Sequence, residues 1–332
     1  MKLLITGGLG FIGSNFIKQI LSNYPDYDII NIDKIGMGAN PENLKDLENR
    51  KGYHFIKGDI SDHKIVSKVI EKVDAVINFA AETHVDRSIA DPKPFLESNI
   101  IGTFNLLEEG RRLNRSVRQI QVSTDETYGD IEQGSFKEED RLKPSNPYSA
   151  SKAAADMLCK AYHRTYGSDI IVTRCTNNFG PYQFPEKLIP KTIIRAQKNL
   201  SIPVYGTGEN IRDWIYVLDH CEALYLILRR GKPGEIYNIS SGNELSTIKV
   251  VKKILEILGK PENLITFVED RPGHDLRYSL DSSKIRKELV WKPRHTFESA
   301  LEKTVEWYVK NEKWWKPIAT KQILHPMPWK MS

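Results

Sequence analysis

The residue pair with the clearest chemical meaning is Tyr148 and Lys152, at the head of an Ala-rich segment, Ala150–Tyr162, whose pattern predicts a helix. Side chains four positions apart share one face of a helix. An ammonium group and a cationic nicotinamide would both lower the pKa of a nearby phenol from about 10, so that it could take a proton from an alcohol. Lys152 could also bind the nicotinamide ribose, and Thr124 offers a hydroxyl that orients the alcohol. Together they predict oxidation of a sugar alcohol with hydride transfer to a nicotinamide.

Two carboxylic acids, Asp125 and Glu126, directly follow Thr124 at the end of a predicted strand. Hydride transfer alone does not require them. A new ketone acidifies the neighbouring C–H bond, so a carboxylate can remove that proton while a second carboxyl group protonates a departing hydroxyl. One group must then be ionised and the other protonated, which requires different surroundings for the two. The pair therefore predicts elimination of water after the oxidation.

Three glycines, Gly7, Gly10 and Gly13, follow the first predicted strand and open the first predicted helix. In this context Gly7 permits the tight turn, Gly10 lets the backbone approach a pyrophosphate, and Gly13 allows close packing of helix on sheet. The helix N-terminus adds unpaired N–H groups. Asp33, twenty residues after Gly13, is placed to bind ribose hydroxyls and to repel a 2′-phosphate. We predict NAD rather than NADP, although the neighbouring Lys34 works against this preference.

Later strand ends extend the predicted cofactor crevice. Asp59 and Ile60 end the third strand, where they would meet the adenine. Ala80 and Ala81 end the fourth, where small side chains would let the cofactor lie against the backbone. The carboxyl ends of successive strands thus predict one continuous binding crevice.

Short β-rich runs alternate with helical patterns in the first half of the chain. The predicted strands are Lys2–Thr6, Asp28–Asp33, His54–Asp59, Ala75–Ala80, Gln119–Ser123 and Ile170–Cys175, and the predicted helices include Ser14–Ser22, Ile65–Lys72 and Phe95–Leu113. This alternation predicts an α/β fold with a Rossmann-type doubly wound parallel sheet over residues 1–176, completed by about 212–231. Pro- and Gly-rich turns around short helices predict a smaller C-terminal α/β substrate-binding lobe over 177–315 and a surface tail over 316–332.

The composition is that of an ordinary globular protein: 332 residues, 40% hydrophobic and 27% charged. No apolar run approaches the roughly 20 residues that cross a bilayer, and a strand begins at Lys2, so we expect neither a membrane span nor a signal peptide. The isolated Cys159, Cys175 and Cys221 fit neither a disulfide framework nor a zinc site. These features predict a cytoplasmic protein without a metal.

The net charge of +5 is small for this length. Arg111, Arg112, Arg115 and Arg118 cluster where a helix is expected to end, and cations favour that end of a helix dipole. We therefore predict no nucleic-acid partner.

Several longer motifs resemble those of the extended short-chain dehydrogenase/reductase family, and within it those of the dTDP-glucose 4,6-dehydratases. The resemblance runs from Lys2 to about Trp314. Its marks are Thr124–Glu126 before Tyr128–Asp130, Glu82–Ser88, Asn177–Tyr182, Phe184–Pro190, Arg212–Trp214 and Asp270–Asp275.

The resemblance implies a role for each chemical group. Tyr148 would take the C4 hydroxyl proton, Glu126 would remove the C5 proton and Asp125 would protonate the leaving C6 hydroxyl, with Thr124 and Lys152 completing the catalytic set. The product would be dTDP-4-keto-6-deoxyglucose. The resemblance also implies a homodimer through the Tyr148 helix and the Phe95–Leu113 helix, and a place in deoxysugar biosynthesis such as that of rhamnose.

Binding residues follow from the same resemblance. We predict that Phe11, Ile12, Thr83, Ser98 and Asn178 join Gly7, Gly10, Gly13, Asp33, Lys34, Asp59, Ile60, Ala80, Ala81, Tyr148 and Lys152 around NAD. The predicted contacts of the nucleotide-sugar are His84, Ser88, Thr124, Asn177, Lys187, Leu188, Pro203, Tyr205, Arg212, Arg271 and His274. Guanidinium groups bind phosphate oxygens bidentately, which independently supports Arg212 and Arg271. Near Thr247 the related dehydratases commonly carry an Asn that touches the nucleotide, and this chain does not.

Two other functions remain open at this stage. A nucleotide-sugar 4-epimerase or decarboxylase of the same fold would share Thr124, Tyr148 and Lys152, but an epimerase needs no acid at C6. A non-catalytic NAD-binding regulator would share the fold without the chemistry. The adjacent Asp125 and Glu126 favour the dehydratase over both.

Overall fold

A seven-stranded parallel sheet is the centre of the computed structural model, which describes residues 1–113 and 116–330. Arg115 and the last two residues of the predicted tail lie outside the described residues. The strands follow the order β10-β6-β5-β4-β1-β2-β3. Their bounds are β1 Lys2–Thr6, β2 Asp28–Asp33, β3 Tyr53–Lys57, β4 Ala75–Asn78, β5 Arg118–Thr124, β6 Ile170–Cys175 and β10 Ile236–Ile239. The order 3-2-1-4-5-6 is that of a doubly wound sheet, so the predicted Rossmann-type fold is confirmed.

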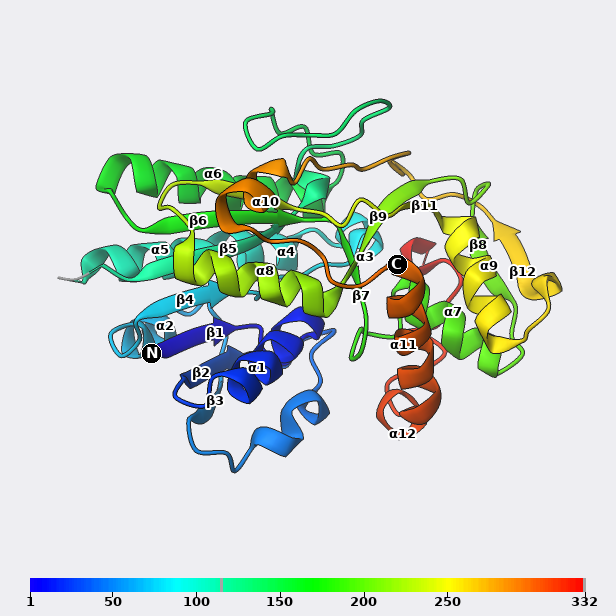
Figure 1. Ribbon diagram of the computed structural model, residues 1–332, viewed down its shortest axis with the longest axis horizontal. Helices are drawn as coiled ribbons and strands as arrows, with labels where there is room; N and C mark the ends of the chain where they lie inside the picture. The colour runs from blue at the N-terminus through cyan, green and yellow to red at the C-terminus, as the bar shows by residue number, and fades with distance from the viewer. Residues whose placement is uncertain (114–115, 331–332) are drawn as a thin grey trace.

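Helices cover both faces of this sheet (Figure 1). One face carries α1 (Phe11–Asn23), α8 (Val217–Arg230) and α10 (Ser283–Leu289). The other carries α2 (His63–Ile70), α5 (Gly102–Arg112) and α6 (Pro147–Tyr166). Every buried strand therefore packs apolar side chains above and below, which explains the near-continuous apolar runs in the sequence.

The predicted helix over Phe95–Leu113 is not continuous. It consists of a short turn α4 (Lys93–Phe95), a π-helical turn η2 (Leu96–Ile101) and then α5. A π-helical turn inserts an extra residue into the helical repeat and often lies at functional sites. Ser98 occupies this turn.

A smaller lobe follows β6 and contains two small sheets (Figure 1). Three strands pair in the order β11-β9-β7, and two pair as β12-β8. The elements of the lobe are β7 Asn177–Phe179, α7 Leu188–Gln197, β8 Ile202–Tyr205, β9 Ile211–Tyr216, β11 Glu244–Ser246, α9 Thr247–Leu258, η4 Glu262–Leu264, β12 Ile265–Val268, α11 Phe297–Lys310 and α12 Glu312–Trp315. Its core gathers Phe179, Ile189, Ile193 and Trp214 with residues of α11.

The boundary between the two units differs from the predicted one. Residues 212–216 belong to β9 of the lobe, whereas α8, β10 and α10 complete the large sheet and its helical cover. The large unit therefore draws on residues beyond 231 that we had assigned to the lobe. Alternation of strand and helix is clear only in the first half of the sequence. The sequence therefore did not predict that the chain returns to the large sheet after β9.

Local sequence explains where α6 begins and ends. The Asn146 side chain accepts from Ser149 N at 2.9 Å, and the Ser149 hydroxyl accepts from Asn146 N at 3.2 Å, which forms a capping box. Pro147 occupies the first turn, where its missing N–H costs nothing. Gly167 ends the helix in the left-handed conformation, with φ of 67°. Tyr148 and Lys152 are thereby fixed in the first two turns.

The predicted surface tail is packed against the lobe, so this prediction was wrong. Ala319, Ile323 and Leu324 are buried, and Ala319 and Leu324 belong to the apolar core of the lobe. The turn η5 (Pro328–Lys330) lies against α3 (Val85–Ala90). Within residues 1–113 and 116–330, none of the helices is long and apolar enough to cross a membrane.

Candidate active site

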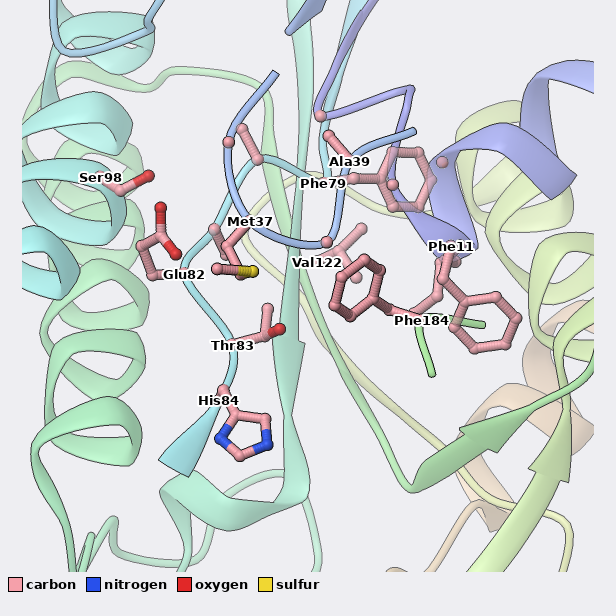
Figure 2. A pocket seen from close by; sticks show the side chains of 18 of the residues that line it. Phe11, Met37, Ala39, Phe79, Glu82, Thr83, His84, Ser98, Val122 and Phe184 are labelled. Atoms are coloured by element: carbon pink, nitrogen blue, oxygen red, sulfur yellow. The ribbon is translucent and has the colours of Figure 1, made fainter. Parts of the chain in front are cut away.

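A cavity of about 300 Å³, here called the sheet cavity, opens at the carboxyl ends of the parallel strands. Figure 2 shows Phe11 and Phe184 on one side of it and Glu82 and Ser98 on the other. All the residues predicted to bind the cofactor line it: Gly7, Gly10, Phe11, Ile12, Gly13, Asp33, Lys34, Asp59, Ile60, Ala80, Ala81, Thr83, Ser98, Tyr148, Lys152 and Asn178.

Gly7 makes the turn after β1 possible. Its φ is +69°, and a Cβ at this position would lie 2.6 Å from Ala80 N. A side chain here would therefore be strained and would also clash with the backbone that follows β4. The turn leads into α1, whose first residues have no side-chain cap. Their N–H groups are therefore free to bind an anion.

Asp33 is held rigidly at the end of β2. Its carboxylate accepts from Leu9 N at 3.0 Å and from Ile35 N at 2.8 Å. Burial raises the pKa of Asp33, while these two N–H donors oppose that shift. The neighbouring Lys34 lies 2.9 Å from Glu82 and 3.7 Å from Asp59. Its charge is thus paired with carboxylates, which weakens the objection that Lys34 favours NADP.

A second cavity of about 190 Å³, the lobe cavity, adjoins the first. It is lined by the predicted substrate residues His84, Asn177, Lys187, Leu188, Pro203, Tyr205, Arg212, Arg271 and His274. The two cavities meet at residues that line both of them: Thr83, His84, Glu126, Asn177, Glu186 and Lys187. Thr124 lines the sheet cavity beside this junction.

Ser88 is the exception among the predicted binding residues. It is fully buried and lines neither cavity. Its hydroxyl donates to Val85 O at 2.7 Å and accepts from Tyr148 N at 3.2 Å. Ser88 therefore connects α3 to the start of α6 and does not reach the substrate space. Its place in a polar motif of α3 gave no indication of which way the side chain faces.

The Tyr148 phenol lines the sheet cavity beside the junction, within hydrogen-bonding reach of Thr124. Burial, and then the Glu126 carboxylate, raise the pKa of Tyr148 well above its usual value. Lys152 Nζ donates to Val122 O at 2.7 Å. Burial thus dominates the Tyr148 pKa in the protein alone, and the lowering expected from Lys152 together with a cationic nicotinamide stays a prediction.

Asp125 and Glu126 occupy the short turn η3 (Asp125–Thr127) immediately after β5. Asp125 is 3% exposed and receives a hydrogen bond from the Thr124 hydroxyl at 3.0 Å. Burial, reinforced by the Glu126 charge, raises the pKa of Asp125 to about 8. Burial also raises the pKa of Glu126, but Arg271, Arg212 and Lys187 oppose this shift. At neutral pH the raised pKa favours a protonated Asp125, while the three cations act to stabilise the charged form of Glu126.

Cations gather on the lobe side. Arg271 pairs with the buried Asp86 at 3.0 Å. The Arg212 guanidinium lies 4.2 Å from the centre of the Tyr278 ring and donates to Asp275 O at 2.9 Å. Such groups can bind the oxygens of a diphosphate.

Sequence reasoning missed part of both cavities. The sheet cavity also includes Gly36–Ala39, Gln183 and Phe184, and the lobe cavity includes Asp86, Glu186, Lys191, Asn210 and Tyr278. Asp86, Glu186 and Phe184 fall within the motifs Glu82–Ser88 and Phe184–Pro190, so the sequence does carry a signal for these three cavity residues. Lys191 lies just beyond such a motif, and no local signal distinguishes it from a surface lysine. The described residues contain no group of three or more His, Cys, Asp or Glu that could hold a metal ion.

The doubly wound sheet, the glycine turn at the crevice and the Thr124–Tyr148–Lys152 set define an extended short-chain dehydrogenase/reductase. A profile of the GDP-mannose 4,6 dehydratase family matches residues 4–304. The chain belongs to that family.

Individual relatives agree with this assignment. The chain is 46% identical to dTDP-glucose 4,6-dehydratase of Escherichia coli, with 96% of each chain covered. It superimposes on the structure of dTDP-glucose 4,6-dehydratase from Streptomyces venezuelae, which has NAD and dTDP bound, with a TM-score of 0.93 and 44% identity over 96% of this chain and all of that one. UDP-glucose 4-epimerase of Thermotoga maritima shares the fold, with a TM-score of 0.87, at 28% identity over 94% of this chain and all of that one.

Proposed function

We propose that the protein is an NAD-dependent hydro-lyase that converts dTDP-glucose to dTDP-4-keto-6-deoxyglucose and water. The observation that carries the proposal is the pair of neighbouring carboxyl groups beside Tyr148 and Thr124, Asp125 in the sheet cavity and Glu126 at its junction with the lobe cavity. The raised pKa of Asp125 suits an acid, and the cations that face Glu126 suit a base. Oxidation or epimerisation at C4 would not need that pair. The curated and structural relatives named above support the same activity.

The sheet cavity fits NAD. The close approach at Gly7 and the uncapped start of α1 suit a pyrophosphate, and the buried Asp33 suits ribose hydroxyls. Asp33 would repel a 2′-phosphate. When bound, NAD supplies the acceptor for the C4 hydride, returns that hydride at C6, and brings a cationic ring that offsets the effect of burial on the Tyr148 pKa.

The remaining steps belong to side chains of this chain. Tyr148 and Thr124 hold the C4 hydroxyl, and Tyr148 takes its proton as C4 becomes a ketone. Glu126 then removes the acidified C5 proton, while Asp125 donates its proton to the C6 hydroxyl, which leaves as water. Glu126 returns a proton to C5 when C6 receives the hydride. Each proton transfer of this kind contributes about 10²–10⁴-fold to the rate.

The lobe cavity would hold the nucleoside diphosphate. Arg212, Arg271 and Lys187 line it and supply cationic donors for phosphate oxygens. Tyr205 and Pro203, both on β8, would meet the base. Thr247 lies in the same cavity, so the replacement of the usual Asn bears directly on nucleobase preference.

We also propose a homodimer that works in the cytoplasm, within deoxysugar biosynthesis such as that of rhamnose. The dimer is supported by exposed apolar side chains along η2, α5 and α6, namely Leu96, Ile101, Phe104 and Met157. Three buried, free cysteines suit a reducing compartment.

The test is incubation of the protein and NAD with dTDP-, UDP- and CDP-glucose in deuterated water. We expect a 4-keto product labelled at C5 that has lost the C6 hydroxyl, with dTDP-glucose the best substrate. Glu126→Gln should still oxidise C4 but should lose dehydration by about 10²–10⁴-fold. A product inverted at C4 that keeps its C6 hydroxyl would instead identify an epimerase.

A further inference from the structure

The C-terminal segment 316–330, here called the clasp, packs on the helix that forms one wall of the lobe cavity. That helix is α7, in which eight of ten residues are buried. Leu324 and Ala319 of the clasp join the apolar core that contains Ile189 and Ile193 of α7. The clasp is thus continuous with the lobe that it covers.

Two buried cations of α7 hold the clasp through its backbone. Lys191 Nζ donates to His325 O at 3.2 Å, and Arg195 Nη1 donates to Leu324 O at 2.7 Å. Lys191 is only 8% exposed and Arg195 only 9%. A buried ammonium or guanidinium requires acceptors, and Arg195 also donates to the Ser201 carbonyl and hydroxyl. Loss of the clasp carbonyl groups would therefore affect Lys191 more than Arg195.

The same helix face continues to the substrate space. Lys187, at the cap of α7, and Lys191 and Arg195 within it are spaced four residues apart, so they follow one another along one side of the helix. Lys187 and Lys191 both line the lobe cavity. The Lys191 side chain therefore lines the lobe cavity and also binds the clasp.

The end of the clasp reaches two further walls of the lobe cavity. The turn η5 lies against α3, as Figure 1 shows at the red end of the chain. The helix α3 carries Asp86, the partner of Arg271. Lys330 pairs with Glu269, two residues before Arg271, although both side chains are exposed and such pairs contribute little.

We propose that the clasp is a positioning element for the nucleotide-sugar and that it acts mainly by fixing Lys191 in the wall of the lobe cavity. The His325 carbonyl takes one of the three ammonium donors and leaves two for other acceptors. The ligand served by this cation is a nucleoside diphosphate, whose oxygens accept hydrogen bonds from ammonium groups. This inference rests on the proposed function, since it assigns the lobe cavity to that substrate.

Four proteins test it: the full chain, a chain ending at Lys316, Lys191→Met, and the combination of both changes. Binding of dTDP to each NAD-loaded protein is measured by titration calorimetry, together with NAD affinity and KM and kcat for dTDP-glucose. We expect each single change to weaken dTDP binding by about tenfold, the loss of one hydrogen bond to a charged group, with NAD affinity unchanged. The combined change should be no worse than the truncation alone, because both remove one interaction.

Controls separate this role from a general effect on folding. Lys253→Met removes a surface lysine of α9 that pairs with Glu298, and it should change neither affinity. Lys191→Arg should restore part of the dTDP affinity. If the truncated chain does not fold, Lys191→Met decides the question. Unchanged dTDP affinity, or equal loss of dTDP and NAD binding, would overturn the inference. Failure of the full chain to bind dTDP would overturn the proposed function itself.

Discussion

The sheet cavity and the lobe cavity are lined by different kinds of residues. The sheet cavity places glycine turns, small residues and single polar side chains at successive strand ends, with Phe11, Phe79 and Phe184 beside them. The lobe cavity adds long ionic side chains from α3, α7, β9 and the segment after β12 to an aromatic and polar lining. Close backbone approach shapes the sheet cavity, whereas charged side chains give the lobe cavity its affinity for anions. The first therefore tolerates few changes of shape, whereas the second depends on partners that lie far apart in sequence, such as Asp86 and Arg271.

The largest effect is expected at Tyr148, beside the junction, where a change should impair the reaction and preserve ligand binding in both cavities. Tyr148→Phe should lower turnover by about 10²–10⁴-fold, because the C4 hydroxyl loses its proton acceptor. Affinities for NAD and dTDP should stay within about twofold, since the phenol is one contact among many. Stopped-flow absorbance of reduced nicotinamide after substrate addition measures the oxidation. Tyr166→Phe, at the exposed end of the same helix, is the matched control.

Arg271→Gln should impair ligand binding in the lobe cavity and leave binding in the sheet cavity unchanged. The change removes a cation and leaves the buried Asp86 without its partner at 3.0 Å. We expect dTDP affinity to fall by about 10–100-fold, in line with the loss of charge-assisted hydrogen bonds, while NAD affinity holds. Calorimetric titration with each ligand measures both. Arg294→Gln, which breaks an exposed pair with Glu222, should leave both affinities intact. Equal loss of NAD binding would contradict separate cavities.

Gly7→Ala should impair ligand binding in the sheet cavity and leave binding in the lobe cavity unchanged. A methyl group there meets Ala80 N at 2.6 Å with φ at +69°, and the left-handed backbone adds about 1–2 kcal/mol of strain. NAD affinity should fall by about tenfold or more, with dTDP affinity preserved in the folded protein. Gly134→Ala is a matched control, because Gly134 has φ of +76° and open space around its Cβ position. Equal loss of NAD affinity in both variants would contradict a specific role for the close approach at Gly7.

The pH profile tests the division of labour between the two carboxyl groups at the junction. Burial raises the pKa of Asp125 to about 8, so this acid is protonated below that pH and loses its proton as the pH rises. The rate of dehydration should therefore decline above about pH 8, approaching tenfold per pH unit. Single-turnover loss of the C6 hydroxyl, followed by NMR across this range, measures it. A rate that keeps rising through pH 9 would contradict Asp125 as the acid.

The smallest effect is expected at Lys34. Its ammonium pairs with Glu82 and Asp59 at the rim of the sheet cavity and remains about a third exposed. Lys34→Ala should change NAD affinity by less than about fivefold, because exposed ion pairs contribute about 0–1 kcal/mol. The preference for NAD over NADP should persist, since Asp33 maintains it. Lys45→Ala, which breaks an exposed pair with Glu42, serves as control.

Much of the fold was predictable because local signals repeat in the first half of the chain. The bounds of β1, β2 and β6 coincide with the predicted ones. The break at η2 and the return of β10 to the sheet were not predicted. A π-helical turn has no clear sequence signature, and a strand of four residues after the lobe carries no sign of which sheet it joins.

The sequence by itself determined the strand ends that form the sheet cavity and the chemical groups at the junction. Parallel strands bring their carboxyl ends to one edge, so glycines and carboxylates at those ends must meet there. Only the tertiary structure decided that Ser88 faces away from substrate and that Lys191 belongs to the lobe cavity. It also decided that the tail is a packed clasp and that Asp125 is buried, which raises its pKa to about 8. Burial and long-range pairing set these properties, and neither is encoded in local spacing.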